Sequence, residues 1–175
     1  MKKIAILSLL SLSLISCGGE PEKKDDSKMT IGGDTELKKE ETTDKVEEDN
    51  GVIELSIEGS DQMKYNKKRL RAKAGAEVEL TFKHVGEMSK QAMGHNFVLL
   101  KKGTDIMAFA EKAAGAMDND YIPEDADEII VHTEMLGGGE STVLKFTAPE
   151  EKGEYDFVCS FPGHVALMKG KFIVK

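Results

Sequence analysis

Hydrophobic and polar residues alternate along several short stretches of the last two-thirds of the chain. The clearest is Glu77–Phe82, with the sequence Glu-Val-Glu-Leu-Thr-Phe, in which every second side chain is apolar. A period of two places alternate side chains on opposite faces of a strand, so this stretch predicts a half-buried β-strand. Further strands are predicted at residues 52–57, 96–100, 128–133, 141–146, 155–159 and 171–174. Such short strands, several of them separated by turn residues, are typical of an all-β sandwich or barrel.

One stretch departs from this period. Residues 105–117 are rich in Ala, Met, Lys and Glu, which favour helix. Thr104 precedes the stretch and is a candidate N-cap. The sequence therefore predicts one helix among the strands.

The first 17 residues have the pattern of an export signal. Lys2 and Lys3 precede an apolar core at residues 4–15, which is too short to span a bilayer as a mature helix. The core ends in Leu14-Ile15-Ser16-Cys17, which resembles the lipobox of bacterial lipoproteins. We therefore predict a signal peptide over residues 1–17 with lipid attached to Cys17. The alternative is an ordinary secretory signal with a chance cysteine.

Residues 18–50 differ in composition from the C-terminal two-thirds of the chain. They are strongly charged, contain Gly18-Gly19 and Pro21, and have few apolar residues. Such a segment cannot bury enough apolar surface to offset the entropy lost on ordering. It is predicted to be a charged flexible linker, either a tether with a role in reaching a partner or a plain spacer. The domain proper is predicted to span residues 51–175.

Charge and cysteine count narrow the classes of function. The net charge of −8 and the absence of a basic stripe argue against a nucleic-acid partner. The one basic run, Lys67-Lys68-Arg69 with Arg71, is interpreted as a solvated strand and turn. The chain has two cysteines, so lipidation of Cys17 would leave Cys159 as the only thiol and would exclude a disulfide within the domain.

The candidate chemistry is concentrated near the C-terminus. Cys159, His164 and Met168 lie within ten residues, and a Pro-Gly pair at 162–163 would turn the chain between them. His95 lies far upstream, in a Gly-His-Asn sequence. One thiolate, two imidazoles and a thioether are the ligand set of a blue-copper electron-transfer site, with methionine as the weak axial ligand.

Each residue of this set also has a simpler interpretation. A buried cysteine is usually a small hydrophobe, and a histidine in a surface loop usually has no ligand. The chain has nine methionines, and most methionines fill cores. The joint spacing of Cys159, His164 and Met168 is what favours a metal site over these alternatives.

Residues 53–175 resemble azurin, a bacterial cupredoxin. The resemblance is carried by the ligand loop, by Gly94-His95-Asn96, and by three further motifs: Gly59-Ser60-Asp61-Gln62-Met63, Asp118-Asn119-Asp120-Tyr121 and Val131-His132-Thr133. It implies a Greek-key β-sandwich of about eight strands with one helix outside the sandwich. It also implies an outer-sphere electron carrier with one type 1 copper per chain.

The resemblance further assigns roles around the metal. Asn96 would bridge the two ligand loops by hydrogen bonds, with Phe161 also next to the ligands, and the Gly94 carbonyl would be a distant axial contact. An apolar rim would surround His164, the ligand nearest solvent, and would be the electron-transfer patch; its members are Met93, Phe161, Pro162 and Leu167. Simple core packing is the alternative for these four residues.

His84, His132 and the lack of a disulfide also bear on the resemblance to azurins. Both His84 and His132 match azurin histidines, and neither is expected to bind metal. His84 is either a titrating group near the site or an ordinary core histidine, and His132 is expected at the surface. Azurins usually carry a disulfide whose positions align here with Ile53 and Gly75, so this end of the domain must be held by packing.

We therefore expect an electron carrier and not an enzyme, because the chain has one domain and no His-x-His pair for further copper sites. A copper chaperone or storage protein is the alternative. The expected partners are a redox donor and acceptor, such as a cytochrome or a terminal reductase or oxidase. The expected location is an exported protein, lipid-anchored to a bacterial membrane and facing the periplasm or the cell exterior.

Overall fold

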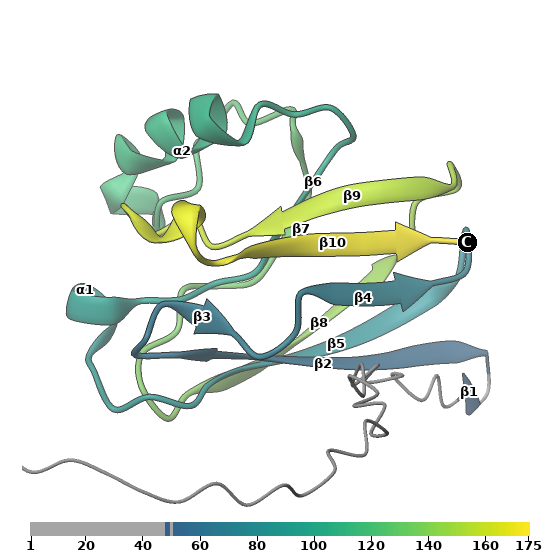
Figure 1. The fold of residues 1–175 in the computed structure, drawn as a ribbon, viewed down its shortest axis with the longest axis horizontal. Coiled ribbons are helices and arrows are strands. Elements are labelled where there is room, and N and C mark those ends of the chain that lie inside the picture. The colour runs from purple at the N-terminus through teal and green to yellow at the C-terminus, as the bar shows by residue number, and fades with distance from the viewer. Residues whose placement is uncertain (1–47, 50) are drawn as a thin grey trace, which may run out of the picture. The chain divides into compact units, whose positions relative to one another are not determined.

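Two β-sheets face each other around the main hydrophobic core (Figure 1). The structure, a computed structural model, describes Glu48–Asp49 and residues 51–175. The predicted signal peptide and nearly all of the predicted linker lie outside the described residues. One sheet has the order β1-β2-β5-β8, with β3 paired to β2, and the other has the order β4-β10-β9-β6-β7. This confirms the predicted all-β sandwich.

The described residues form ten strands, two short α-helices and two 3-10 turns. The strands are β1 Glu48–Asp49, β2 Val52–Ser60, β3 Lys64–Tyr65, β4 Arg69–Ala72, β5 Glu77–His84, β6 Val98–Leu100, β7 Ile129–His132, β8 Ser141–Thr147, β9 Gly153–Val158 and β10 Lys169–Val174. The helices are α1 Lys90–Met93 and α2 Ile106–Ala114, and the 3-10 turns are η1 Met117–Asn119 and η2 His164–Ala166. All seven predicted strands are present, with shifted ends.

The alternation in β5 places its apolar side chains on the inner face. Val78, Leu80 and Phe82 are buried in the main core, and the intervening residues face outward. His84 occupies the next inward position of the same strand and is fully buried. The alternation in β5 therefore places the His84 imidazole at the end of the core, beside the candidate site.

β6 is buried on both faces, which explains its unbroken apolar run. Leu99 points into the main core between the sheets, whereas Val98 and Leu100 pack with Phe109 of α2 in a second cluster. Helix α2 thus lies outside the sandwich, as predicted (Figure 1).

The predicted cap of α2 is wrong by one residue. Asp105, not Thr104, is the N-cap: its Oδ1 accepts hydrogen bonds from the backbone N–H groups of Met107 (2.9 Å) and Ala108 (3.2 Å). The Thr104 hydroxyl instead donates to the Lys101 carbonyl at 2.8 Å. A cap must reach the N2 and N3 amides, and Thr104 lies one position too early to do so. The helix also ends at Ala114, before the predicted end at Met117.

The end of the domain that lacks the azurin-type cysteines is held by packing and pairing. Ile53 is buried in the core, and Gly75 has a φ of +68°, which favours glycine. Within the segment predicted as linker, Glu48–Asp49 forms β1 and pairs antiparallel with Val52 and Ile53 of β2. The ordered strands therefore begin before residue 51.

Over the described residues, no helix is long and apolar enough to cross a bilayer.

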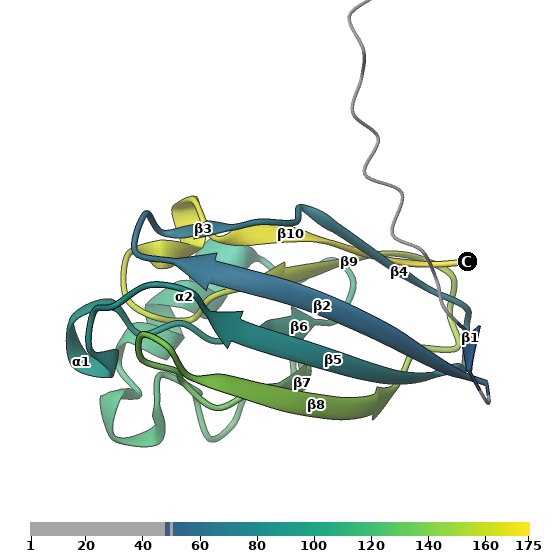
Figure 2. The same ribbon diagram turned by 90° about the horizontal axis from the view of Figure 1, so that it is seen from below.

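The candidate site lies at one end of the sandwich. The end of β9, the turn η2, the start of β10 and helix α1 all lie at this end, and both views show it opposite the C-terminus (Figures 1 and 2).

Candidate metal centre

The loop between β9 and β10 is closed by backbone hydrogen bonds. The Cys159 amide donates to the Met168 carbonyl at 3.0 Å, and the Met168 amide donates to the His164 carbonyl at 2.8 Å. Gly163 has a φ of +81°, which an L side chain rarely adopts, so the predicted turn at this Pro-Gly pair is present. The turn places Cys159 and His164 on the same side of the loop.

His95 is fixed from the other side of the site. Its backbone exchanges two hydrogen bonds with Leu136 in an isolated β-bridge. Its Nε2 lies 2.9 Å from the Ser60 carbonyl oxygen, so Nε2 carries the proton and donates it. Its Nδ1 is then an acceptor, and it is the single buried side-chain nitrogen or oxygen of the described residues without a hydrogen-bond partner. A buried lone pair without a donor is costly, and a metal ion would satisfy it.

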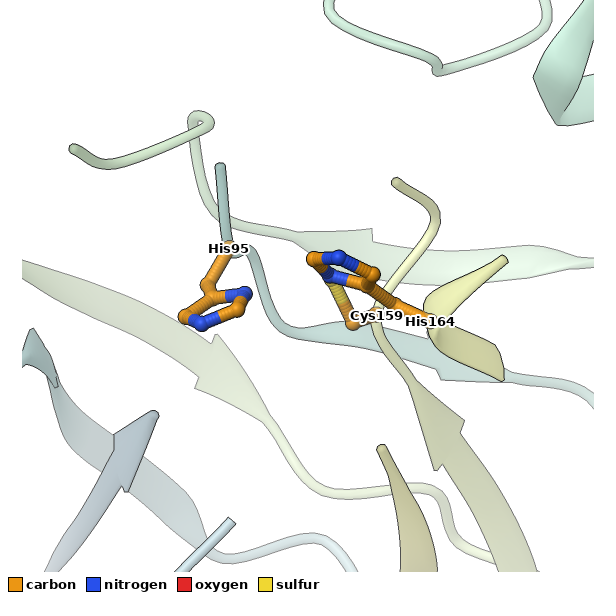
Figure 3. Close-up of side chains that lie close together, drawn as sticks. All are labelled: His95, Cys159 and His164. Atoms are coloured by element: carbon orange, nitrogen blue, oxygen red, sulfur yellow. The ribbon is translucent and has the colours of Figure 1, made fainter. Parts of the chain in front are cut away.

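Three candidate ligand atoms converge on one point. One atom each of His95, Cys159 and His164 lies within 4.8 Å of the others, and all three residues are buried. The Cys159 Sγ and the His164 Nδ1 are 3.7 Å apart. Figure 3 shows the His95 and His164 rings next to each other, with the Cys159 side chain beside His164. One sulfur and two nitrogens at this separation suit a soft or borderline cation such as copper or zinc.

Polar backbone groups lie close to the Cys159 sulfur. The Gly94 carbonyl oxygen lies 3.9 Å from the Cys159 Sγ. Burial raises the pKa of the Cys159 thiol, and the backbone N–H groups of Asn96 and Phe161 partly oppose that rise. These amides would favour a thiolate once a cation replaced the thiol proton.

Met168 lies at the base of the site and is fully buried. A Cβ added to Gly59 would come within 3.2 Å of the Met168 Cε and 3.0 Å of the His95 Cδ2. Glycine at position 59 therefore leaves the room in which the methionine and the imidazole pack against β2. Ligation by the Met168 thioether stays a prediction.

Asn96 links the two ligand-bearing segments. Its Oδ1 accepts from the Ser160 amide at 2.9 Å, and its Nδ2 donates to the Ser160 hydroxyl at 2.8 Å. Both residues are fully or almost fully buried, so these bonds are shielded from water. The Tyr65 hydroxyl also donates to the Asn96 carbonyl. The side chain thus has the bridging position that the sequence predicted for it.

We expect Asn96→Ala to lower the free energy of unfolding of the metal-free chain by about 2 kcal/mol, because the buried Ser160 amide loses its acceptor. Urea unfolding of both proteins measures the difference. Ser160→Ala is the matched control, since it removes the hydroxyl and keeps the Ser160 amide bonded to Asn96. A loss in Asn96→Ala no larger than in Ser160→Ala would contradict the bridging role.

Burial changes the acid–base behaviour of the site. Burial raises the pKa of the Cys159 thiol to about 11. Burial, together with the charges of His95 and His84, lowers the pKa of His164 to about 4. Burial also lowers the pKa of His95. At neutral pH the metal-free site therefore holds a neutral thiol and two neutral imidazoles, and only the thiol must lose a proton to bind a cation.

Copper binding at pH 7 is therefore expected to release about one proton per chain, from Cys159, because metal binding requires the thiolate and both imidazoles are already neutral. Titration in weakly buffered solution with a pH indicator measures the release. Cys159→Ser provides the control and should release close to none. Release of two or more protons would show that a histidine is charged in the metal-free site.

The predicted apolar rim is only partly exposed. Met93 and Phe161 are half-buried, Pro162 is exposed, and Leu167 retains 50% of its surface. His164 is 3% exposed, whereas His95, Cys159 and Met168 are fully buried.

The sequence did not single out Tyr121 as a member of this surface. Its ring packs edge-on against Phe161, with ring centroids 5.2 Å apart. The centroid of the Phe161 ring in turn lies 4.6 Å from that of His164. Asp120 and Tyr121 both have positive φ values, 51° and 60°. This backbone turns the segment after η1 toward the ligand loop.

The two remaining histidines have different surroundings. His84 is buried, with Nε2 3.1 Å from the Asp61 carboxylate, Nδ1 3.3 Å from the Leu136 carbonyl, and its ring centroid 4.2 Å from that of His95. His132 is exposed at the end of β7, as expected. Asp61 belongs to the Gly59–Met63 motif, and only the tertiary structure shows it to be the partner of His84.

A sequence model of a known family decides the membership of the chain. The family is described as copper binding proteins, plastocyanin/azurin family, and its model matches residues 52–175. The chain belongs to this family. The match covers all four candidate ligands, and the family together with the His95–Cys159–His164 cluster supports the predicted single type 1 copper.

Individual members of the plastocyanin/azurin family agree with this. Azurin of Alcaligenes faecalis is 38% identical over 122 residues, which cover 68% of this chain and 95% of that protein. Outer membrane protein H.8 of Neisseria meningitidis is 40% identical over 123 residues, covering 69% of this chain and 67% of that protein. Among solved structures, the azurin Az-iso2 of Methylomonas sp. strain J has a TM-score of 0.64 at 33% identity, covering 70% of this chain and 97% of that chain. These likenesses confirm the cupredoxin sandwich.

Proposed function

We propose that this protein carries single electrons between redox partners at a bacterial membrane or in the periplasm. One type 1 copper would be held by His95, Cys159 and His164. Met168 would be the weak axial ligand, and the Gly94 carbonyl a more distant axial contact. Its fold, its family and the donor set all support this proposal.

One observation carries the ligand assignment. The His95 Nε2 is bonded to the Ser60 carbonyl, while its buried Nδ1 has no hydrogen-bond partner, and His95 belongs to the same cluster as Cys159. A histidine kept only for packing would be expected to bond both ring nitrogens or expose one. The orientation suits a metal ligand whose second nitrogen is held by a backbone carbonyl.

The chain's own residues supply the rest of the mechanism. When bound, copper supplies a one-electron couple whose potential depends on the axial donor and on the hydrophobicity around the sulfur. Asn96 and the His95–Leu136 bridge hold both ligand segments in place, which limits rearrangement when the charge of the site changes. Burial of Cys159 and Met168 excludes water from the site. His164, the most exposed of the four, is the proposed exit for the electron.

The direct test is spectroscopy of the copper-loaded full-length chain. We expect an intense visible absorption band from the thiolate, the narrow copper hyperfine splitting of a type 1 site in electron paramagnetic resonance, and a reversible one-electron wave. A copper chaperone or storage protein would bind exchangeable copper without the thiolate band. Colourless Cu(II) protein with more than one copper per chain would therefore refute the electron-carrier proposal.

We further propose that the rim around His164 is where redox partners dock. Met93, Phe161, Pro162 and Leu167 place apolar surface beside the exit, and Leu167 is half exposed. A small apolar contact suits a carrier, since the partner must leave after each transfer. The donor and acceptor are proposed to be redox proteins such as a cytochrome or a terminal reductase or oxidase, and the chain is proposed to be a carrier and not an enzyme.

We also propose that the mature chain is exported and anchored by lipid on Cys17. The sequence before Cys17 resembles a lipobox, and one relative is named an outer membrane protein. Cys17→Ala is expected to move the protein from the membrane to the soluble fraction while it still binds copper, because every candidate ligand lies in residues 94–168. Fractionation by ultracentrifugation measures the distribution. Unchanged membrane attachment of the variant would rule out the anchor.

A further inference from the structure

Positive charge is segregated within the domain. Residues 51–175 contain 16 lysine and arginine residues against 20 aspartate and glutamate residues, a net charge of −4. Yet residues 64–76 contain six basic residues and no acidic one, and residues 169–175 add three lysines, again without an acid. A solvated strand and turn, the interpretation given to Lys67-Lys68-Arg69 with Arg71, does not explain why a second basic run lies against this one.

The two runs meet at the site end of the sandwich. The Lys68 Nζ donates to the carbonyl of Leu167 at 2.8 Å and to that of Lys169 at 3.2 Å. Lys64 lies in β3, and both views place β3 and the start of β10 at the same end as η2 (Figures 1 and 2). In the pairing of β2 with β3, Lys64 lies opposite Ser60, whose carbonyl holds the His95 ring. The pKa of Lys68 is lowered, first by burial and then by the charges of Lys169 and Lys64, which agrees with this placement of both lysines near Lys68. We call Lys64, Lys68 and Lys169 the lysine cluster.

Among the described residues, the lysine cluster has no carboxylate partner. Several lysines of the domain form ion pairs with carboxylates: Lys90, Lys102, Lys112, Lys145 and Lys171. In the part of the chain that the structure describes, no carboxylate pairs with Lys64, Lys68 or Lys169. Three like charges close together repel one another, and a local field of one sign attracts an external group of the opposite sign.

The lysine cluster also adjoins the proposed exit for the electron. Lys68 is bonded to the carbonyl of Leu167, the half-exposed apolar residue next to Met168 in the ligand loop. We propose that Lys64, Lys68 and Lys169 are the electrostatic part of the partner-docking surface, which receives a redox protein that presents carboxylates beside its redox centre. This inference rests on the proposed function and adds the charge of the partner to it.

A second charged segment gives the docking a direction. Residues 118–128 contain six acidic residues and no basic one, and Tyr121 of this segment packs on Phe161. Asp120 and Glu128 are paired with Lys90 and Lys112. The acidic segment therefore adjoins the ligand loop through Tyr121 on the Phe161 side, and the lysine cluster adjoins it near Leu167. A partner with carboxylates is attracted at Leu167 and repelled at Phe161, which fixes its orientation over His164.

An anionic membrane surface is the other occupant that such a cluster could bind. The geometry favours a redox protein, because a membrane seated on the lysine cluster would also cover Leu167 and obstruct access to His164. A redox protein docked on the lysine cluster must lie close to His164 in order to receive the electron.

The first test needs no metal. Hexacyanochromate(III), a paramagnetic and redox-inert trianion, is added to the metal-free, isotope-labelled full-length chain, and line broadening of the backbone amides is measured. We expect broadening at Lys64, Lys68, Leu167 and Lys169 at low ionic strength, and much less in Lys169→Glu. Broadening spread evenly over the lysines, or centred on Lys83 of β5, would overturn the proposal.

The second test uses the sign of the salt effect on electron transfer. The reduced copper-loaded chain gives one electron to hexacyanoferrate(III), which becomes hexacyanoferrate(II). If the overall charge of −8 governed the encounter, the rate would rise with ionic strength, since anion and protein would repel. If the lysine cluster governs it, the rate falls with ionic strength. A rising rate overturns the proposal.

Charge reversal locates the effect. Lys169→Glu is expected to slow oxidation by hexacyanoferrate(III) and reduction by an acidic plant-type ferredoxin about three- to tenfold at low ionic strength, converging with the parent at high ionic strength. Lys83→Glu is the matched control, because it makes the same charge change on exposed β5 and should alter the rates less than about twofold. Lys64→Gln serves as a second variant if Lys169→Glu folds poorly. The reduction potential of each variant is measured, so that an equal driving force is verified.

The outcomes separate the two proposals. A blue, redox-active chain whose lysine variants match Lys83→Glu keeps the proposed function and overturns the docking surface. A colourless chain that still localises hexacyanochromate(III) at the lysine cluster keeps the anion-binding surface and overturns the electron carrier. Phosphatidylserine vesicles and ferredoxin are each added in competition with hexacyanochromate(III). If the vesicles reduce the line broadening of these amides more than ferredoxin does, the proposed redox partner is wrong and a membrane binds there.

Discussion

Cys159→Ser is expected to abolish the intense visible absorption of the copper-loaded chain. That absorption requires charge transfer from a thiolate, and a serine hydroxyl stays protonated at neutral pH and binds copper weakly. The substitution exchanges one buried atom in a fully buried position, so the fold should be retained. Absorption and circular dichroism spectra of the same sample separate loss of the site from loss of the fold. A blue Cys159→Ser variant would falsify the proposed ligand set.

Met168→Leu is the matched variant, because it alters the proposed axial position and keeps His95, Cys159 and His164. We expect it to remain blue and to have a higher reduction potential, since a thioether stabilises Cu(II) more than Cu(I) and leucine offers no donor. Voltammetry measures the change. Loss of the band would make Met168 a principal ligand, and a lower or unchanged potential would remove it from the axial position.

Gly170→Ala should lower the free energy of unfolding by about 3 kcal/mol, the largest expected loss of stability, because overpacking a rigid core forces side chains or backbone to move. A Cβ at this position would lie 2.2 Å from the Phe157 Cζ and 2.6 Å from the Lys68 carbonyl oxygen. Phe157 is fully buried, and its ring is held between Tyr65 and Phe97 at centroid distances of 5.6 and 5.1 Å. It has little room to move away.

Urea unfolding of the metal-free chain measures this effect without interference from copper. Gly115→Ala is the control, since Gly115 ends α2 with a φ of −79° and its nearest atom to an added Cβ is 3.4 Å away. It should change the stability by less than about 1 kcal/mol. A Gly170→Ala variant as stable as this control would show that β9 and β10 separate more easily than the packing indicates.

Strands set by local pattern could be predicted from the sequence. The alternation in β5 identified its buried face, and its last inward position correctly places His84 inside, although the sequence left its role open. β1 and β3 have two residues each and exist through pairing with β2, so no local period marks them. The cap of α2 was misplaced because Thr104 and Asp105 are both good capping residues, and the choice depends on which side chain reaches the first free amides.

Part of the candidate site could likewise be predicted from the sequence, and part depends on distant contacts. The spacing of Cys159, His164 and Met168 lies within one loop and could be recognised locally. The orientation of the His95 ring depends on a carbonyl 35 residues earlier, and the partner of His84 lies 23 residues earlier. The meeting of Lys68 with Leu167 joins residues 99 positions apart. Such contacts are set by sheet pairing, which a single sequence does not display.

Burial of Cys159 has a consequence for the lifetime of the protein before it acquires metal. With a pKa of about 11, only about one thiol in ten thousand is ionised at pH 7, and the thiolate is the form that oxidants attack. Cys159 also has no second cysteine within residues 51–175 with which to form a disulfide. The metal-free protein is therefore expected to keep its sulfur reduced longer than a protein with an exposed thiol of ordinary pKa would, which leaves more time for copper to arrive.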